Sequence, residues 1–233
     1  MRTEAKGYFL KEYGSWSVLI IAYIIGMGVS RTFVWQALPV LVALGLLINS
    51  KQAFTRWNRR AGAREALAVF LVQLAIAAGI IISIVGRDIP LLLPLLVFPA
   101  AYLAMSLVAG EHNIVTELLG FALLSLSSVI AKFLVVGGLD VRLFVAVALY
   151  FTAGVFKVKA VLLKKPLDRA LAVLYILFAA YAYRRFHISL LILLPLAENV
   201  VMSATLYKVR LQTTGWIEVV KSLLFLGLMI WMF

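Results

Sequence analysis

The sequence predicts an all-α fold, a polytopic bundle of transmembrane helices that forms a single domain over residues 1–233. Hydrophobic residues make up 64% of the chain and charged residues only 14%. Soluble domains are about 45–50% apolar and about 25% charged. The apolar residues also fall in long runs, and a membrane-spanning helix needs about 20 of them. We therefore expect lipid to be the solvent for much of the protein surface.

Nine apolar segments predict nine spans, which short polar or basic turns separate. Two of them, 141–156 and 170–183, are short for a bilayer, so seven or eight spans remain alternatives. The first of these two, the sixth segment, could continue through Leu163. Pro195 lies inside the eighth segment, where it removes a backbone donor and is expected to open a kink. The predicted spans are 15–29, 33–49, 66–85, 91–109, 114–136, 141–156, 170–183, 188–207 and 216–233.

Lysine and arginine gather near the N-terminus and in two predicted loops, 51–64 and 157–169. Cytoplasmic loops of membrane proteins carry an excess of these residues. Because an even number of spans separates the two loops, we expect a cell-membrane protein with a cytoplasmic N-terminus and an external C-terminus. The basic residues on the predicted cytoplasmic side are Arg2, Lys6, Lys11, Lys51, Arg56, Arg59, Arg60, Arg64, Lys157, Lys159, Lys164, Lys165, Arg169, Lys208 and Arg210.

The composition excludes several classes of function. The net charge is +12, but the basic residues sit in short loops, so we expect no nucleic-acid partner. The chain has no cysteine, which excludes disulfides, thiolate metal sites and thiol nucleophiles. The two histidines, His112 and His187, are far apart in sequence. We expect no cofactor and no bound metal. The one exception left open is Glu111 with Glu117, which lie near the same membrane boundary and could hold a metal if a third ligand came from elsewhere. The basic loops could hold anionic lipid or phosphate, although the favoured interpretation is that they only set the topology.

Two carboxylates within predicted spans, Glu117 and Glu198, are the strongest site candidates, because ionisable residues are costly in a membrane. Each could contact a substrate, a proton or an ion, or could form an ion pair between helices. We expect both to face one internal cavity near the first span. On a helix, Glu117 shares a polar or small face with Asn113, Gly120, Ser127, Ser128 and Ala131, and Lys132 borders this face.

Further binding candidates lie at the start of the first span and in the second basic loop. Glu12 could also be explained by the helix dipole, and Trp16 by anchoring at the membrane interface. Glu218 and Trp216 allow the same two explanations at the last span. Small residues spaced four apart in the third and fourth spans predict close helix packing. These additional binding candidates are Glu12, Tyr13, Trp16, Lys157 and Lys159, and the small residues are Ala75, Gly79, Ser83, Ala100 and Ala104.

The stretch 11–19, which reads KEYGSWSVL, resembles the opening KEHGAW signature of the YwiC-like membrane proteins. Two more stretches, 110–120 and 151–159, are similar to that family. This chain has Tyr13 where the family usually has histidine. The resemblance covers most of the chain and implies a multi-pass membrane architecture rather than a particular activity.

A looser resemblance, in topology alone, is to the intramembrane prenyltransferases of the UbiA type. Those enzymes resemble this chain in having nine helices with cytoplasmic loops after the second and sixth. Their loops carry Asp-rich metal motifs. The corresponding loops here are basic, and Asp168 is their only aspartate. The resemblance therefore does not extend to the metal ligands of Mg²⁺-dependent prenyl transfer.

These observations favour a protein that binds or transports a lipid-like or small anionic molecule at an internal polar site. One alternative is an intramembrane enzyme that acts on a lipid or isoprenoid, as a divergent UbiA-like prenyltransferase without the Asp-rich motifs. Another alternative is a subunit of a membrane complex.

Overall fold

The structure is a computed structural model that describes residues 8, 10, 12–59, 63–111, 113–205 and 211–233. All regular elements in this part of the chain are helices, as predicted. They are α1 (Tyr13–Val29), α2 (Ala37–Asn58), α3 (Ala63–Val85), η2 (Gly86–Asp88), α4 (Ile89–Leu92), η3 (Leu93–Leu96), α5 (Val97–Ala109), α6 (Ile114–Val136), α7 (Val141–Leu163), α8 (Pro166–Arg185), η4 (Leu190–Leu196), α9 (Ala197–Thr205) and α10 (Leu211–Met232).

Within the described residues, six helical stretches are long and apolar enough to cross a membrane, so the chain is a multi-pass membrane protein. Two further apolar helices, Tyr13–Val29 and Leu190–Thr205, are shorter. The six stretches are Ala37–Asn58, Arg64–Ala109, Ile114–Val136, Val141–Leu163, Pro166–Arg185 and Thr214–Met232.

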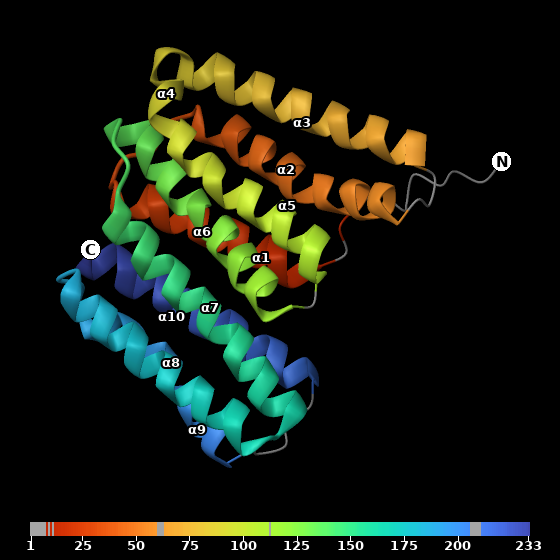
Figure 1. Cartoon of the computed structure of the whole chain (residues 1–233). Coiled ribbons are helices and arrows are strands. Elements are labelled where there is room, and N and C mark those ends of the chain that lie inside the picture. The colour runs from red at the N-terminus through yellow and green to blue at the C-terminus, as the bar shows by residue number, and fades with distance from the viewer. Residues whose placement is uncertain (1–7, 9, 11, 60–62, 112, 206–210) are drawn as a thin grey trace.

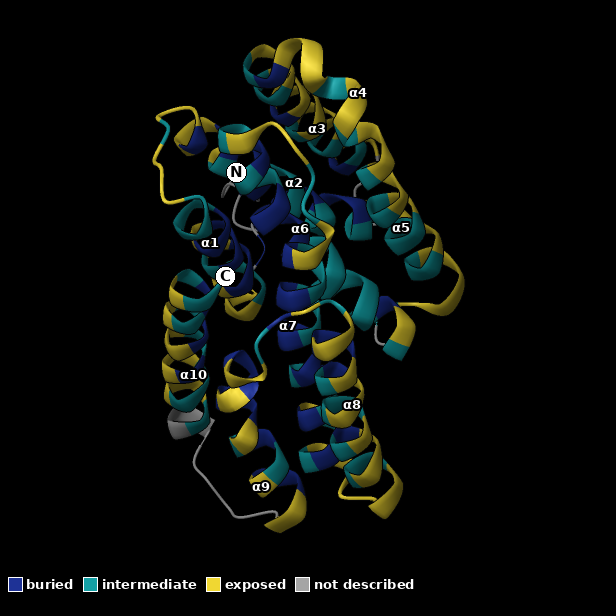
Figure 2. Ribbon diagram, turned by 90° about the vertical axis from the view of Figure 1, so that its left-hand side faces the viewer, coloured by how far each residue is buried: buried dark blue, intermediate teal, exposed yellow. Residues whose placement is uncertain are grey.

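Successive long helices run back and forth along the bundle (Figure 1). The stretch from Arg64 to Ala109 folds back on itself at α4, so that α3 and α5 run in opposite directions. Prolines at the start of α4 and η3 accompany this turn. The helix pairs in most extensive contact are α2 with α3, α1 with α6, α7 with α8 and α6 with α7. Figure 2 shows that buried residues concentrate on α1, α6 and α7, whereas few residues of α3 and none of α5 are buried.

The backbones of α1 and α6 approach each other closely because small residues line the facing surfaces of the two helices. A Cβ atom at Gly26 would collide with the backbone carbonyl of Ser128 and would lie 2.8 Å from the Cβ of Ala131. Nearby, the hydroxyl of Ser127 donates a hydrogen bond of 3.1 Å to the carbonyl of Leu19. Close packing of this kind holds helices together in lipid, where no hydrophobic effect drives them to associate.

The small-residue stripes predicted in the third and fourth spans do not make such contacts, so that prediction was wrong. Their five residues are all exposed, and no atom lies within 4 Å of a Cβ built at Gly79. Buried residues of α3 include Ala66 and Ala77. The spacing of small residues indicates which face of a helix would permit close approach of another helix. The tertiary arrangement decides whether that face meets a neighbouring helix.

The two predicted basic loops are largely helical. Lys51 and Arg56 lie in α2, which starts later and ends later than the predicted span, and Lys157 and Lys159 lie in α7. Lysine and arginine are good helix formers, and their long side chains carry the charge away from the apolar surface. The chain leaves α7 only at Lys164, which adopts a left-handed conformation two residues before a proline. Seven residues used in the sequence predictions lie outside the described part of the chain: Arg2, Lys6, Lys11, Arg60, His112, Lys208 and Arg210.

The eighth predicted span is broken. Its first part is the 3-10 helix η4, which contains Pro195, and its second part is α9. The described helix ends at Thr205.

The connection between α6 and α7 is fixed by Asp140, which lies outside both helices. Its carboxylate accepts hydrogen bonds from the amide of Leu143 at 3.0 Å and from the ammonium group of Lys132 at 2.6 Å. Partial burial alone would raise the pKa of Asp140, but these hydrogen bonds outweigh burial and hold its pKa below the ordinary value. The same residue therefore caps α7 and ties it to α6.

We expect Gly26→Ala to destabilise the protein, because the added Cβ would push α1 away from α6. Overpacking of a close contact costs about 1–3 kcal/mol. Gly154→Ala is the matched control, since a Cβ at this helical position meets no atom within 4 Å. Thermal unfolding in detergent should show a lower midpoint for Gly26→Ala and an unchanged or higher one for Gly154→Ala. Equal midpoints for the two variants would contradict the contact.

Candidate functional site

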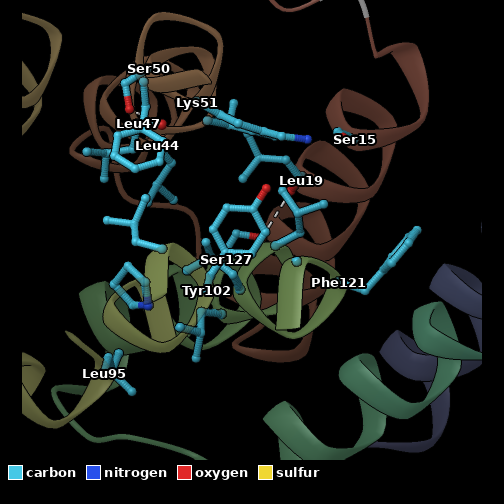
Figure 3. A pocket seen from close by; sticks show the side chains of 18 of the residues that line it. Ser15, Leu19, Leu44, Leu47, Ser50, Lys51, Leu95, Tyr102, Phe121 and Ser127 are labelled. Carbon is cyan, nitrogen blue, oxygen red and sulfur yellow. Dashed lines mark hydrogen bonds between the residues drawn. The ribbon is translucent and has the colours of Figure 1, made fainter. Parts of the chain in front are cut away.

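A cavity of about 450 Å³ lies between α1, α2, α3, α5 and α6. Its volume is within the range of about 300–1,000 Å³ that is usual for ligand pockets. Along α6 it extends from Thr116 to Ile130, a rise of about 21 Å at about 1.5 Å per residue. The cavity is therefore elongated along the bundle. Its walls are mainly apolar and include Leu19, Leu44, Leu47, Phe70, Leu74, Pro99, Leu103, Phe121 and Leu124 (Figure 3).

Charged residues gather at one end of this cavity. Lys51 extends from α2 toward α1 (Figure 3). Its ammonium nitrogen lies 2.8 Å from a carboxylate oxygen of Glu12, at the start of α1. The same carboxylate accepts a hydrogen bond of 2.9 Å from Ser15. The hydroxyl of Tyr102 lies beside Lys51. These side chains meet because the start of α1 and the end of α2 lie at the same end of the bundle.

Two more carboxylates complete the polar end. Glu111 follows α5 and accepts a hydrogen bond of 2.7 Å from the hydroxyl of Thr55. Glu117 lies in the first turn of α6, 3.4 Å from the ammonium nitrogen of Lys159. Both carboxylates line the cavity together with Glu12 and Lys51.

The hydroxyl of Thr116 is a polar group in the cavity wall without a satisfied hydrogen bond. Thr116 is only 1% exposed, and its Oγ1 atom has no hydrogen-bond partner among the described residues. Buried polar atoms usually have partners, so this hydroxyl marks a place where a ligand could supply one.

The predicted site residues Asn113, Trp16 and Tyr13 do not line the cavity. The side chain of Asn113 accepts from the amide of Val115 at 2.9 Å and thereby caps α6. Trp16 donates its indole N–H to the carbonyl of Leu10 at 3.1 Å. Tyr13 is 85% exposed and is not among the residues that line the cavity.

A second group of charges lies among α7, α9 and α10. The ammonium nitrogen of Lys157 is 2.6 Å from Glu198 and 2.5 Å from Glu218. Lys221 is 2.9 Å from Glu198 and 3.0 Å from Glu218, and it also donates to Asn199. Both lysines are buried, and each has at least two acceptors. We call these five residues the α7–α10 charge cluster.

The prediction that Glu117 and Glu198 face one cavity was wrong. Glu117 lines the cavity, whereas Glu198 belongs to the α7–α10 charge cluster and is not among the lining residues. Helix α7 carries a lysine partner for each carboxylate, Lys159 for Glu117 and Lys157 for Glu198. Positions two apart on a helix point about 200° apart, so Lys157 and Lys159 face opposite ways.

Sequence reasoning did not propose Lys51, Tyr102 or Thr116 as site residues, and it considered Glu111 only as a metal ligand beside Glu117. Lys51 was interpreted as a topology signal, because a lysine after an apolar run is usually one. Glu111 lies in a stretch that resembles the YwiC-like proteins, and this resemblance was the available signal. No group of three or more metal-ligating side chains occurs in the part of the chain that the structure describes.

Comparison with known proteins gave one finding. A family model described as YwiC-like protein matches residues 10–132. This range contains the five helices that line the cavity, except for the last turn of α6, whereas the α7–α10 charge cluster lies beyond it. Neither the curated proteins nor the solved structures contain a match to this chain.

We expect Lys157→Ala to destabilise the protein strongly, because it leaves Glu198 without one of its two lysine partners. Removing one member of a buried ion pair costs about 3–5 kcal/mol. Lys159→Ala is the matched control on the same helix, since its partly exposed pair with Glu117 should contribute about 0–1 kcal/mol. Thermal unfolding in detergent would measure both changes. A smaller loss for Lys157→Ala than for Lys159→Ala would refute a stabilising role of the cluster.

Proposed function

The chain belongs to the YwiC-like protein family, and we propose that this membrane protein binds a lipid-like amphiphile in the cavity between α1, α2, α3, α5 and α6. The observation that carries the proposal is the combination of long apolar walls with charged groups at one end only. Such a cavity matches a molecule that has a hydrocarbon chain and a small polar head.

The apolar walls supply the affinity in this proposal. Burial of apolar surface contributes about 25 cal/mol per Å², so a hydrocarbon chain that fills the cavity is favoured over water. The polar end would orient the head group, because a few polar groups in an apolar pocket fix how a ligand lies.

The position of the cavity supports access from the bilayer. Helix α3 packs against α2, and α5 packs against α6, whereas α3 and α5 make little contact with each other along their lengths. Both helices contribute to the cavity walls. An amphiphile could therefore enter sideways between them without crossing water.

A small anionic solute, the other ligand that the sequence suggested, is less well supported. Among the described lining residues there are three carboxylates, from Glu12, Glu111 and Glu117, and one ammonium group, from Lys51. Like charges at close range would repel an anion.

We further propose that the chain crosses the membrane nine times, with a cytoplasmic N-terminus and an external C-terminus. The nine passes would be α1, α2, α3, α4 with α5, α6, α7, α8, η4 with α9, and α10. In support, α1 begins at one end of the bundle and α10 ends at the other (Figure 1). Lysines of α2 and α7 lie near the end that would face the cytoplasm, as the excess of positive charge there requires.

We expect Leu103→Trp to weaken amphiphile binding by about tenfold or more, a loss of about 1.4 kcal/mol, because the indole would fill part of the cavity. Leu174→Trp on α8 is the matched control, since Leu174 is exposed to lipid and does not line the cavity. Binding of a fluorescent single-chain amphiphile to purified protein would measure the difference. Wild-type binding by Leu103→Trp would argue against this cavity as the site.

We expect opposite labelling of two single-cysteine variants, which the cysteine-free chain makes possible. In intact cells, a membrane-impermeant maleimide should label Phe233→Cys, and it should label Trp57→Cys only after the membrane is permeabilised. The unaltered chain is the control for background labelling. Reaction of both positions from the same side would rule out an odd number of passes between them.

A further inference from the structure

Among the described residues that line the polar end of the cavity, carboxylates outnumber cations. Glu12 forms an ion pair with Lys51, whose ammonium nitrogen lies 2.8 Å from a carboxylate oxygen. Glu111 accepts from a neutral hydroxyl, and the nearest cation in the described structure, Arg59, is 4.0 Å away with a side chain that is 69% exposed. Among the described residues, the one cation paired with Glu117 is Lys159, at the longer distance of 3.4 Å. Two carboxylates on the cavity surface are therefore weakly compensated.

This imbalance matters because the rest of the cavity is apolar. Electrostatic interactions strengthen as the surrounding dielectric falls, so an incompletely paired carboxylate beside apolar walls favours an added cation. Lys159 and Arg59 do not line the cavity, and they approach these carboxylates from outside it. The side that faces the cavity remains available to a ligand.

The unpartnered hydroxyl of Thr116 is an independent indication at the same place. Thr116 precedes Glu117 in the first turn of α6, and both residues line the cavity. A hydroxyl oxygen accepts hydrogen bonds, and an alkylammonium group offers three N–H donors. One ammonium head could thus satisfy Thr116 and a carboxylate together.

We propose that the amphiphile bound in this cavity has a cationic, N–H-bearing head group, which Glu117 and Glu111 bind. This inference rests on the proposed function and specifies its ligand class. The chemistry is shared by free long-chain amines and by lipids whose head group ends in an amine. Glu117 provides the charge, Thr116 accepts a hydrogen bond, and the hydrocarbon chain lies along the apolar walls.

The test is displacement of a bound, uncharged fluorescent amphiphile from the full-length protein in detergent at neutral pH. The competitors are dodecylamine, dodecanol, dodecanoate and phosphatidylethanolamine, which vary the head group. We expect dodecylamine to displace the probe at about tenfold lower concentration than dodecanol, with dodecanoate the weakest of the single-chain competitors. Displacement by phosphatidylethanolamine at concentrations similar to dodecylamine would identify an amine-bearing lipid as the source. Weak displacement by it would identify a free amine.

Glu117→Gln should remove most of the preference for dodecylamine over dodecanol and leave the affinity for dodecanol unchanged. Glu65→Gln is the matched control, because it removes a negative charge from the exposed start of α3 without altering the cavity lining. Glu111→Gln should reduce the preference as well, and it keeps the inference testable if Glu117→Gln does not fold.

The outcomes separate the two proposals. Equal displacement by amine and alcohol, or stronger displacement by the carboxylate, would overturn the cationic head group and leave amphiphile binding intact. An unchanged amine preference in both folded glutamine variants would also overturn it. Failure of the probe and of every competitor to bind would instead overturn the proposed function.

Discussion

The close contact between α1 and α6 is the constraint on which the rest of the structure depends. Gly26 lets the backbone of α1 approach the carbonyl of Ser128, and Ser127 then reaches the carbonyl of Leu19. With these two helices fixed, Glu12 at the start of α1 and Glu117 at the start of α6 line one end of the same cavity. A larger residue at the contact would separate the carboxylates as well as the helices.

The bundle handles buried charge in two different ways. In the α7–α10 charge cluster, two lysines and two glutamates balance, and each lysine has at least two acceptors. Such a cluster is balanced in charge, and its ion pairs join α7, α9 and α10. At the end of the cavity the carboxylates are in excess and one hydroxyl has no partner in the described structure. A ligand binds most favourably where charged or polar groups still lack partners, because it then makes interactions that the protein does not already make.

Local signals in the sequence predicted the helices well and their partners poorly. The bounds of α6 were predicted residue for residue, because an asparagine cap precedes it and Gly137, with a φ of 74°, ends it. The basic segments were mistaken for loops, since charge marks topology but does not break a helix. Glu12 and Glu117 were predicted as candidates from their own positions. The pairing of Lys157 with Glu198, 41 residues away, depends on packing between helices that no local pattern contains.

Helix α7 connects the part of the chain that the family model matches with the part beyond it. The match ends within α6, so the cavity walls lie in the matched region. Yet the described cation that pairs with Glu117 is Lys159 of α7, and Lys157 of the same helix pairs with glutamates of α9 and α10. The position of Lys159 beside Glu117 is therefore set by contacts on the opposite face of its own helix. Through this arrangement the C-terminal helices help to place a cation beside Glu117, although none of their described residues lines the cavity.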